Sequence, residues 1–390
     1  MGQADRPKRN GQIMIEIMVT GLIFLGILSV LILIHEAGHF FTARAFGVKV
    51  LEFGMGYPPR LISITRGQTV YSLNALPLGG YVKLMGEEDP THPQSLAGKG
   101  ALTRLTVLSA GAFMNFILPI ILFTFISMVP QNHYEGRVLI DMVEEASPAQ
   151  IAGLQSGDIV LSVDGHPVHN TQELAYRIKL QLGDESTWMV MRPERLVTGS
   201  FGLGSEPGLT QPLIRDTVPY EVSLIPRWKP PVGEGNAGVR IRTIDGQIIS
   251  RSDSLWAAIP NGFMRMWEML ILFKNEVTTW IIGNNSPQLA GPVGIAQVTG
   301  EVAKAGWIPL VELAALLSLN LAIINILPIP ALDGGRIVFV ALEWVRRGKR
   351  ISPEREGLVH LVGFTLLIGS VVLISYFDII RIFQGGSLTN

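Results

Sequence analysis

The residues best suited to chemistry are two histidines four positions apart, in the string His35-Glu36-Ala37-Gly38-His39. In a helix, residues i and i+4 lie on one face, so both imidazoles can bind the same Zn²⁺ ion. Glu36 lies about 100° further round the helix, where its carboxylate can act on a metal-bound water and not on the metal. The alternative is that the two histidines only extend from the end of an apolar helix toward water.

A third metal ligand is expected at Asp333, in the string Asn325-Ile-Leu-Pro-Ile-Pro-Ala-Leu-Asp-Gly-Gly335. Pro328 and Pro330 remove two backbone donors and break a helix. A carboxylate directly after such a break can complete a His₂-Asp site that leaves one position open for water. The chain contains no cysteine, which excludes thiolate ligands. The alternative is that Asp333 only ends an apolar segment at a membrane interface.

The elements that must hold these residues are membrane-spanning helices. Only 16% of the 390 residues are charged and the net charge is −1, which argues against a nucleic-acid partner. Crossing the hydrocarbon core takes about 20 apolar residues. Four uncharged segments meet this requirement: Ile17–Ile34, Leu105–Tyr134, Leu313–Leu332 and Gly357–Phe377. Val277–Gly300 is uncharged but too rich in Asn, Pro and Gly, and Phe263–Lys274 suits an interfacial amphipathic helix. We therefore expect four transmembrane helices in the lipid bilayer.

Basic residues indicate the orientation of these helices. They gather in two connecting segments, 44–104 and 336–355, which the positive-inside rule assigns to the cytoplasm. Both termini and residues 135–312 are then expected on the outer side. The basic residues of the N-terminal tail argue weakly for the opposite orientation. The first apolar segment is too long, and too closely joined to the histidine motif, to be a cleaved signal peptide.

The predicted fold is a polytopic α-helical membrane protein with a β-hairpin loop and an inserted α+β domain. Its parts are residues 1–43 (N-terminal tail and first transmembrane helix), 44–103 (cytoplasmic, re-entrant β-loop region), 104–130 (second helix), 131–228 (inserted domain), 229–312 (extracytoplasmic linker with amphipathic helices), 313–335 (third helix), 336–356 (cytoplasmic loop), 357–380 (fourth helix) and 381–390 (C-terminal tail).

The β-loop region is predicted from alternating apolar and polar residues. Phe53–Pro59 leads into an alternating segment at Arg60–Thr65, a turn at Arg66-Gly67 and a further strand at Thr69–Leu73, and Leu78–Leu84 follows.

The inserted domain combines strands with two short helices. We expect strands at Val138–Val143, Gly157–Val163, Ser186–Met191 and Val218–Leu224, and an inserted loop at Pro193–Thr217. Helices are expected at Ser147–Leu154, with Ser147 as N-cap, and at Thr171–Gln181, with Thr171 as N-cap.

Residues Ser147–Val168 resemble a PDZ domain of the permuted kind found in bacterial proteases. The resemblance implies a groove that captures an extended peptide as an added strand. Gly136, Arg137, Val138 and Leu139 would then form the loop that binds the peptide carboxylate. The alternative is a domain that binds no peptide and only restricts access.

The pairing of His35-Glu36-Ala-Gly-His39 with Asn325-x-x-Pro-x-Pro-x-Leu-Asp333-Gly closely resembles the site-2 protease family of intramembrane zinc proteases. A single PDZ-like segment is typical of its bacterial RseP/RasP-like branch. The string Gly111-Ala-Phe-Met-Asn115 resembles a further family motif, except that the family's usual Gly-Pro pair reads Gly-Ala at Ala112. Ser286–Ile295 also resembles a family segment.

The resemblance implies one Zn²⁺ per chain, held by His35, His39 and Asp333, with Glu36 as general base. Asn325 and Asn115 would orient the substrate or stabilise the oxyanion, although a buried Asn115 could equally join two helices. The β-loop would re-enter the membrane beside the metal and offer an edge to the substrate.

Substrates implied by the family are single-pass membrane proteins already trimmed by another protease, such as anti-sigma factors, or leftover signal peptides. The implied location is the bacterial inner membrane, with the inserted domain outside and the active site near the cytoplasmic side. Two alternatives have other functions: a non-catalytic zinc-containing scaffold that recruits partners through its PDZ-like domain, and a metal transporter. A transporter is expected to show repeats between its halves, and none is evident. Oligomeric state is not predicted.

Overall fold

The computed structural model describes residues 6–87, 89–192, 218–283 and 290–384. The loop predicted at Pro193–Thr217 lies outside the described residues. Residues 286–289 of the segment Ser286–Ile295 also lie outside them. The chain divides into two compact units, which are described separately. Unit 1 comprises residues 1–126, 255–263 and 288–390, and unit 2 comprises residues 127–254 and 264–287.

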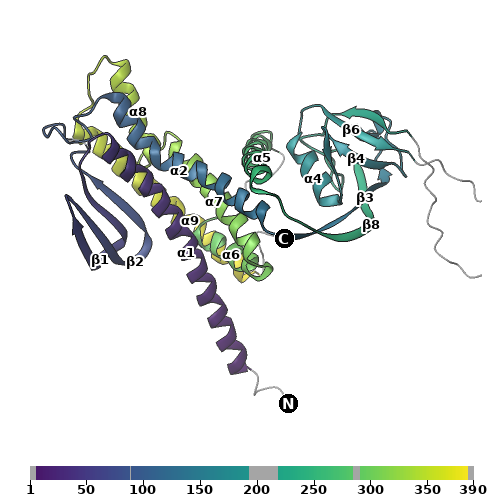
Figure 1. The fold of residues 1–390 in the computed structure, drawn as a ribbon, viewed down its shortest axis with the longest axis horizontal. Helices are drawn as coiled ribbons and strands as arrows, with labels where there is room; N and C mark the ends of the chain where they lie inside the picture. The colour runs from purple at the N-terminus through teal and green to yellow at the C-terminus, as the bar shows by residue number, and fades with distance from the viewer. Residues whose placement is uncertain (1–5, 88, 193–217, 284–289, 385–390) are drawn as a thin grey trace, which may run out of the picture. The chain divides into compact units, whose positions relative to one another are not determined.

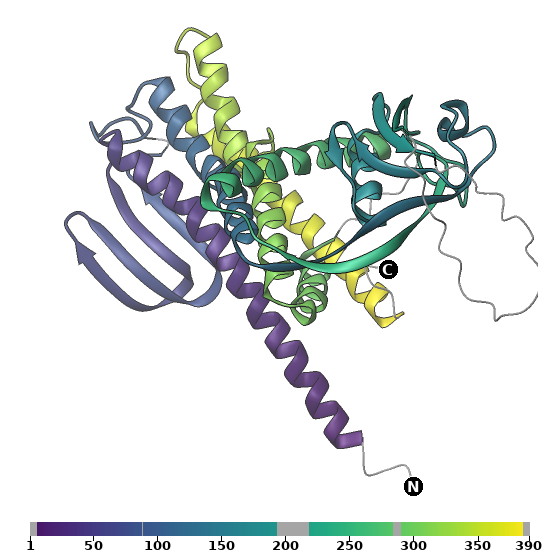
Figure 2. The same cartoon turned by 45° about the vertical axis from the view of Figure 1, so that its right-hand side comes forward.

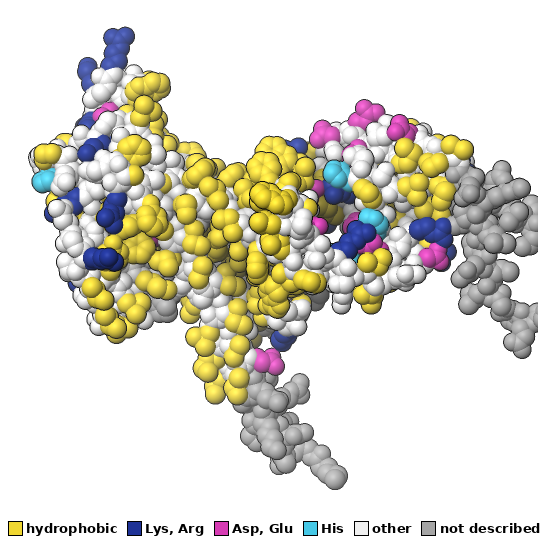
Figure 3. Space-filling model, viewed as in Figure 1, with side chains coloured by type: hydrophobic (Ala, Val, Ile, Leu, Met, Phe, Trp, Pro, Cys, Tyr) yellow, Lys and Arg dark blue, Asp and Glu magenta, His cyan; other side chains and the backbone are white. Residues whose placement is uncertain are grey.

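Unit 1 is built on long apolar helices, shown side by side in Figures 1 and 2. Within the described part of the chain, four helices are long and apolar enough to cross a membrane, as predicted. They are α1 (Arg6–Ala45), α2 (Ala101–Met128), α7 (Trp307–Ile326) and α9 (Pro353–Phe383). Many of their apolar side chains are exposed, and Figure 3 shows them covering this part of the surface. Surfaces of this kind fit a lipid environment.

The uncharged segment that contains the second span extends beyond the helix itself. The uncharged segment runs to Tyr134, but α2 ends at Met128 and the chain continues as a strand from Gln131. Pro130 has no N–H to donate to a helical bond, and the residues that follow pair with another strand. A lack of charge alone does not distinguish a helix from a strand.

The third span is broken as its prolines predict. Helix α7 ends at Ile326, residues 327–332 form a tight connection, and α8 runs from Asp333 to Val345. A Cβ atom at Gly335 would lie 2.5 Å from the Ile329 carbonyl oxygen, so only glycine fits this close turn. At its other end, α8 is tied to α2 by a 2.5 Å bond from Arg104 to Glu343.

Strands β1 (Val50–Arg66) and β2 (Thr69–Leu84) form the predicted hairpin-rich region beside α1. Both strands double back, so Phe53 pairs with Val82 on one side and with Tyr71 on the other. Residues 52–55 therefore lie between residues 70–73 and 80–83. Phe40 of α1 packs edge-on against Phe53, at 5.2 Å between ring centroids, which anchors the hairpin on the helix that carries the histidines.

Unit 2 contains a sheet with the strand order β7-β6-β4-β3-β8, and β5 pairs with β4. The strands are β3 (Gln131–Val143), β4 (Ile159–Val163), β5 (His166–Pro167), β6 (Ser186–Met191), β7 (Tyr220–Leu224) and β8 (Val239–Arg251). Two short helices, α3 (Pro148–Ile151) and α4 (Thr171–Leu180), lie in the same unit, and the fully buried Trp188 is the largest side chain of its core.

The predicted caps of unit 2 have different outcomes. Ser147 is the N-cap of α3, as predicted, and its hydroxyl accepts a bond from the Gln150 backbone. For α4 the prediction was wrong by one residue, because Asn170 is the N-cap and accepts a 2.8 Å bond from the Glu173 N–H. Both Asn and Thr suit this position, so sequence preference does not separate them.

Two helices follow β8. Helix α5 (Leu255–Ile281) is longer than the predicted amphipathic segment, and in unit 2 its buried Glu268 bonds to Arg177 of α4 at 2.6 Å. Helix α6 (Pro292–Ala305) belongs to unit 1, and its first turn is held by the buried Asp378 of α9. The Asp378 carboxylate accepts bonds of 2.9 and 2.8 Å from the N–H groups of Gly291 and Gly294. This contact accounts for the two glycines at the start of α6.

Candidate metal centre

Three predicted ligands from distant parts of the chain meet at one point. His35 and His39, on adjacent turns of α1, have their Nε2 atoms 3.2 Å apart. Oδ2 of Asp333, the first residue of α8, lies 3.0 Å from Nε2 of His35 and 3.1 Å from that of His39. Both histidines are buried. These three side chains are the group among the described residues whose ligand atoms could hold a metal ion.

The spacing of the three atoms fits zinc. Bonds of about 2.0–2.1 Å at tetrahedral angles separate ligand atoms by about 3.3 Å. The observed separations of 3.0, 3.1 and 3.2 Å are close to that value. Two imidazoles and one carboxylate are also a donor set that zinc accepts, with one position left for water or substrate.

Residues of helix α2 contact the Nδ1 atoms of both imidazoles and so orient the rings. Nδ1 of His39 lies 2.8 Å from the Val107 carbonyl oxygen, and Nδ1 of His35 lies 3.4 Å from the side-chain nitrogen of Asn115. A histidine that binds metal through Nε2 carries its proton on Nδ1 and needs an acceptor there. Oδ1 of Asn115 is buried without a hydrogen-bond partner in the described part of the chain. Rotating the Asn115 amide by about 180° presents Oδ1 to Nδ1 of His35. Either orientation is allowed, because the oxygen and nitrogen of an amide are assigned from their hydrogen-bond partners.

Gly111 lets α2 approach the ligands, a role that its sequence motif does not reveal. A Cβ atom at this position would lie 2.6 Å from Nε2 of His35 and closer still to Nε2 of His39. Real Cβ contacts are never this short, so a side chain here would displace the imidazoles.

Glu36 faces the hairpin. Its carboxylate accepts a hydrogen bond from the backbone N–H of Val82 on β2, and a Cβ atom at Gly80 would lie 3.6 Å from its side chain. The predicted general base therefore lies between the metal ligands and the strand formed by residues 80–84.

The remaining predicted site residues are Asn325 in unit 1 and residues 136–139 in unit 2. Asn325 is half-buried in the last turn of α7 and makes no side-chain hydrogen bond to another described residue. In unit 2, Gly136 donates its N–H to the His169 carbonyl oxygen at 2.7 Å. Arg137, Val138 and Leu139 pair with Ile244, Thr243 and Arg242 of β8. The four residues predicted to form the peptide-binding loop therefore lie within β3, which pairs with β8 of the same chain.

Comparison with known proteins agrees with this site. The profile of Peptidase family M50 matches residues 23–370. The chain belongs to peptidase family M50, the site-2 proteases. It is 33% identical to a protein named as a zinc metalloprotease in Clostridium perfringens, over 90% of this chain and 96% of that relative. A zinc metalloprotease of Fusobacterium nucleatum is also 33% identical, over 94% of this chain and all of the relative. The zinc metalloprotease RasP of Oceanobacillus iheyensis is 26% identical over 94% of this chain.

Membership in this family identifies the chain as a metalloprotease with Zn²⁺ as its cofactor. The four apolar helices make this M50 peptidase a multi-pass membrane protein. Its zinc requirement fits the one cluster of three ligand atoms that the described residues provide.

Proposed function

We propose that this M50 peptidase hydrolyses peptide bonds within the transmembrane segments of single-pass membrane proteins. The observation that carries the proposal is the meeting of His35, His39 and Asp333 at the ends of apolar helices, with Glu36 on the same helical turn. We assign these three side chains as the zinc ligands and Glu36 as the general base.

Zinc bound at this position lowers the pKa of water and polarises a carbonyl group. The chain itself supplies the proton transfer. Glu36 takes the proton of the attacking water and passes it to the nitrogen of the leaving amine. The backbone N–H of Val82 approaches this carboxylate from β2. Asn325 is assigned to contact the substrate or the oxyanion, and Asn115 to orient His35.

Cleavage of a transmembrane helix requires that the helix be unwound, because its carbonyl groups are hidden in i→i−4 bonds. An unwound segment in a membrane must form other hydrogen bonds. The edge formed by residues 80–84 lies beside Glu36 and pairs on its other side with residues 50–55. We assign this edge to the substrate, which would add to it as an extended strand.

The proposed orientation places residues 44–104 and 336–355 in the cytoplasm and unit 2 outside a bacterial inner membrane. Single cysteines are suitable probes, because the chain has none of its own. In intact cells stripped of their outer membrane, an impermeant maleimide should label Ser156→Cys and not Lys349→Cys. The reverse pattern would invert the orientation.

For unit 2 we propose control of access and not peptide capture. Its support is β8, which pairs with β3 from Gln131 to Val143, so the residues predicted to bind a peptide already have a partner strand. Val239 and Ile241 pack against the core, and Thr243 accepts a 3.1 Å bond from the start of α4. Ion pairs join β8 to β3 and to Glu144, the residue that follows it: Arg240–Glu144, Arg242–Asp141, Arg137–Asp245 and Arg251–Glu135. Access control fits substrates from which another protease has already removed the outer domain.

A disulfide between β3 and β8 distinguishes access control from peptide capture. Met142 and Arg240 are opposite one another and exposed, so Met142→Cys with Arg240→Cys can lock β8 in place. The locked protein should cleave a short substrate at the rate of its reduced form and still reject one with a large outer domain. Loss of cleavage on oxidation, with recovery on reduction, would show that β8 must leave and would favour peptide capture.

The main proposal is tested by cleavage of a defined transmembrane substrate with purified protein in detergent. Activity should disappear when a chelator removes the metal and return when zinc is added. A protein that binds zinc and cleaves no membrane-embedded substrate, including ones trimmed on the outer side, would contradict the proposal.

A further inference from the structure

The connection between α7 and α8 holds Asp333 through an unusual backbone. Ala331, two residues before Asp333, has a φ of 77°, in the left-handed region that side chains other than glycine rarely adopt. Such a conformation is strained and persists only where surrounding contacts enforce it. Leu332, the N-cap of α8, contributes no side-chain cap. Within the loop the Leu332 N–H donates to the Ile329 carbonyl oxygen at 3.2 Å, and contacts from outside the loop add to this bond.

The described residues provide one such contact from α9. Nδ1 of His360 accepts a 2.8 Å hydrogen bond from the backbone N–H of Ala331. An accepting Nδ1 is unprotonated, so the neutral imidazole carries its proton on Nε2, which lies 4.0 Å from the Glu356 carboxylate. The ring of Phe339, on α8, lies 5.4 Å from the His360 ring. His360 thus touches both the loop and the helix that Asp333 begins.

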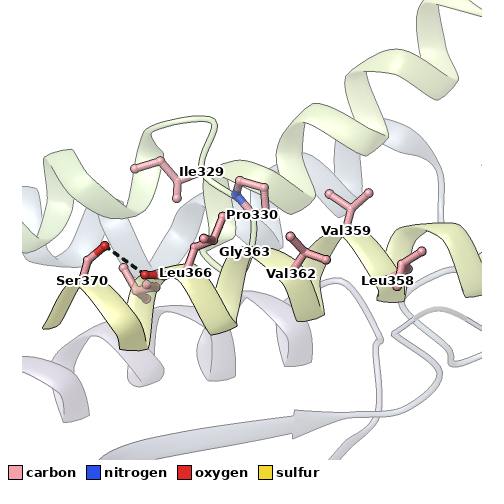
Figure 4. Close-up of a pocket in the computed structure, with 9 residues that line it drawn as sticks. Ile329, Pro330, Leu358, Val359, Val362, Gly363, Leu366 and Ser370 are labelled. Atoms are coloured by element: carbon pink, nitrogen blue, oxygen red, sulfur yellow. Dashed lines mark hydrogen bonds between the residues drawn. The ribbon is translucent and has the colours of Figure 1, made fainter. Parts of the chain in front are cut away.

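Packing between α9 and the loop supports this hydrogen bond. A Cβ atom at Gly363 would lie 2.8 Å from the Pro330 carbonyl oxygen, so the loop rests directly on α9 at this glycine. Figure 4 shows Pro330 next to Gly363, with Val359 and Val362 lining the same pocket from α9. His360 lies one turn before Gly363 in the same helix. The close contact holds the loop at the distance that the His360 bond requires.

We propose that His360 is a positioning residue for the zinc site: it holds the Ala331 N–H, which sets the left-handed turn that aims Asp333 at the two histidines. Its effect on the metal passes through the loop, since Asp333 itself contacts His35 and His39. The inference rests on the proposed role of Asp333 as a ligand.

The test compares two substitutions in the full-length protein purified in detergent. In His360→Asn, the amide oxygen takes the place of Nδ1 and can accept the same bond, whereas His360→Leu has no acceptor. We expect His360→Leu to lower zinc affinity by about 10- to 100-fold, the usual effect of losing an outer partner of a metal ligand. His360→Asn should bind zinc nearly as the unaltered chain does. Zinc affinity is measured by competition with a chromogenic chelator, independently of cleavage.

Thr365→Val is a matched control on the same helix, because its hydroxyl bonds only the Leu361 carbonyl oxygen in the described structure. If His360→Leu does not fold, His360→Gln replaces it, since its amide oxygen takes the place of Nε2 and does not reach Ala331. Unchanged zinc affinity in the leucine or glutamine variant, or an equal loss in the asparagine variant, would overturn the inference. Asp333→Ala separates the two proposals: zinc binding that survives this change would refute the ligand assignment itself.

Discussion

Replacing Gly111 by alanine adds one methyl group in the space beside the two imidazoles. The new Cβ atom would lie 2.6 Å from Nε2 of His35, whereas ordinary van der Waals contacts begin at 3.4 Å. The imidazole or the helix must therefore move by about 0.8 Å, while zinc ligands tolerate displacements of about 0.2 Å. We expect a fall in zinc affinity of at least about 10- to 100-fold, with a similar loss of activity. Overpacking should also destabilise the fold by about 1–3 kcal/mol.

The assay is chelator competition for zinc together with thermal unfolding in detergent. Gly26→Ala is the matched control, because a Cβ atom at this position of α1 meets nothing within 4 Å. Alanine in place of glycine inside an exposed helix stabilises it by about 1 kcal/mol, so the control should bind zinc normally and unfold no earlier. A Gly111→Ala protein with unaltered zinc affinity would refute the geometry proposed for the site.

Three further predictions concern the same unit. Asp333→Ala should lose zinc together with activity, as metal analysis of the purified protein will show, and tightly retained zinc would move the third ligand elsewhere. Asn115→Leu should lower zinc affinity by about 10-fold if the residue orients His35, and unchanged affinity with reduced cleavage would return it to a substrate role. Burial raises the pKa of Glu343, but bonds from Arg104 and Arg350 outweigh it and hold the pKa below its ordinary value. Its stabilising effect is therefore complete above the ordinary glutamate pKa of about 4.3 and is lost as pH falls through the folded-state value. Unfolding scans should show that Glu343→Gln loses less stability on acidification than the unaltered chain, and equal losses would contradict this.

The sequence predicted those features that local patterns determine. The two histidines are four residues apart on one helix, and the prolines that break α7 precede Asp333 directly, so both halves of the site are visible as short motifs. The four spans follow from uncharged length alone. Their meeting is a tertiary event across 294 residues. The break before Asp333 suggested that the two motifs meet, and the resemblance to a known family implied it.

What the sequence did not predict depends on contacts between distant segments. The pairing of β8 with β3 joins residues about a hundred positions apart, and nothing in Val239–Arg251 marks it as the partner of β3. The roles of Gly111 and His360 were not predicted for the same reason. Each is an ordinary residue of an apolar helix until the fold places it beside an imidazole or a strained loop.

The most direct measurement of the central claim uses Glu36→Gln, which keeps the size of the side chain and removes the base. Zinc content and cleavage of a transmembrane substrate are measured on the same purified sample. We predict one zinc ion per chain and no cleavage. Full activity of Glu36→Gln would contradict the account.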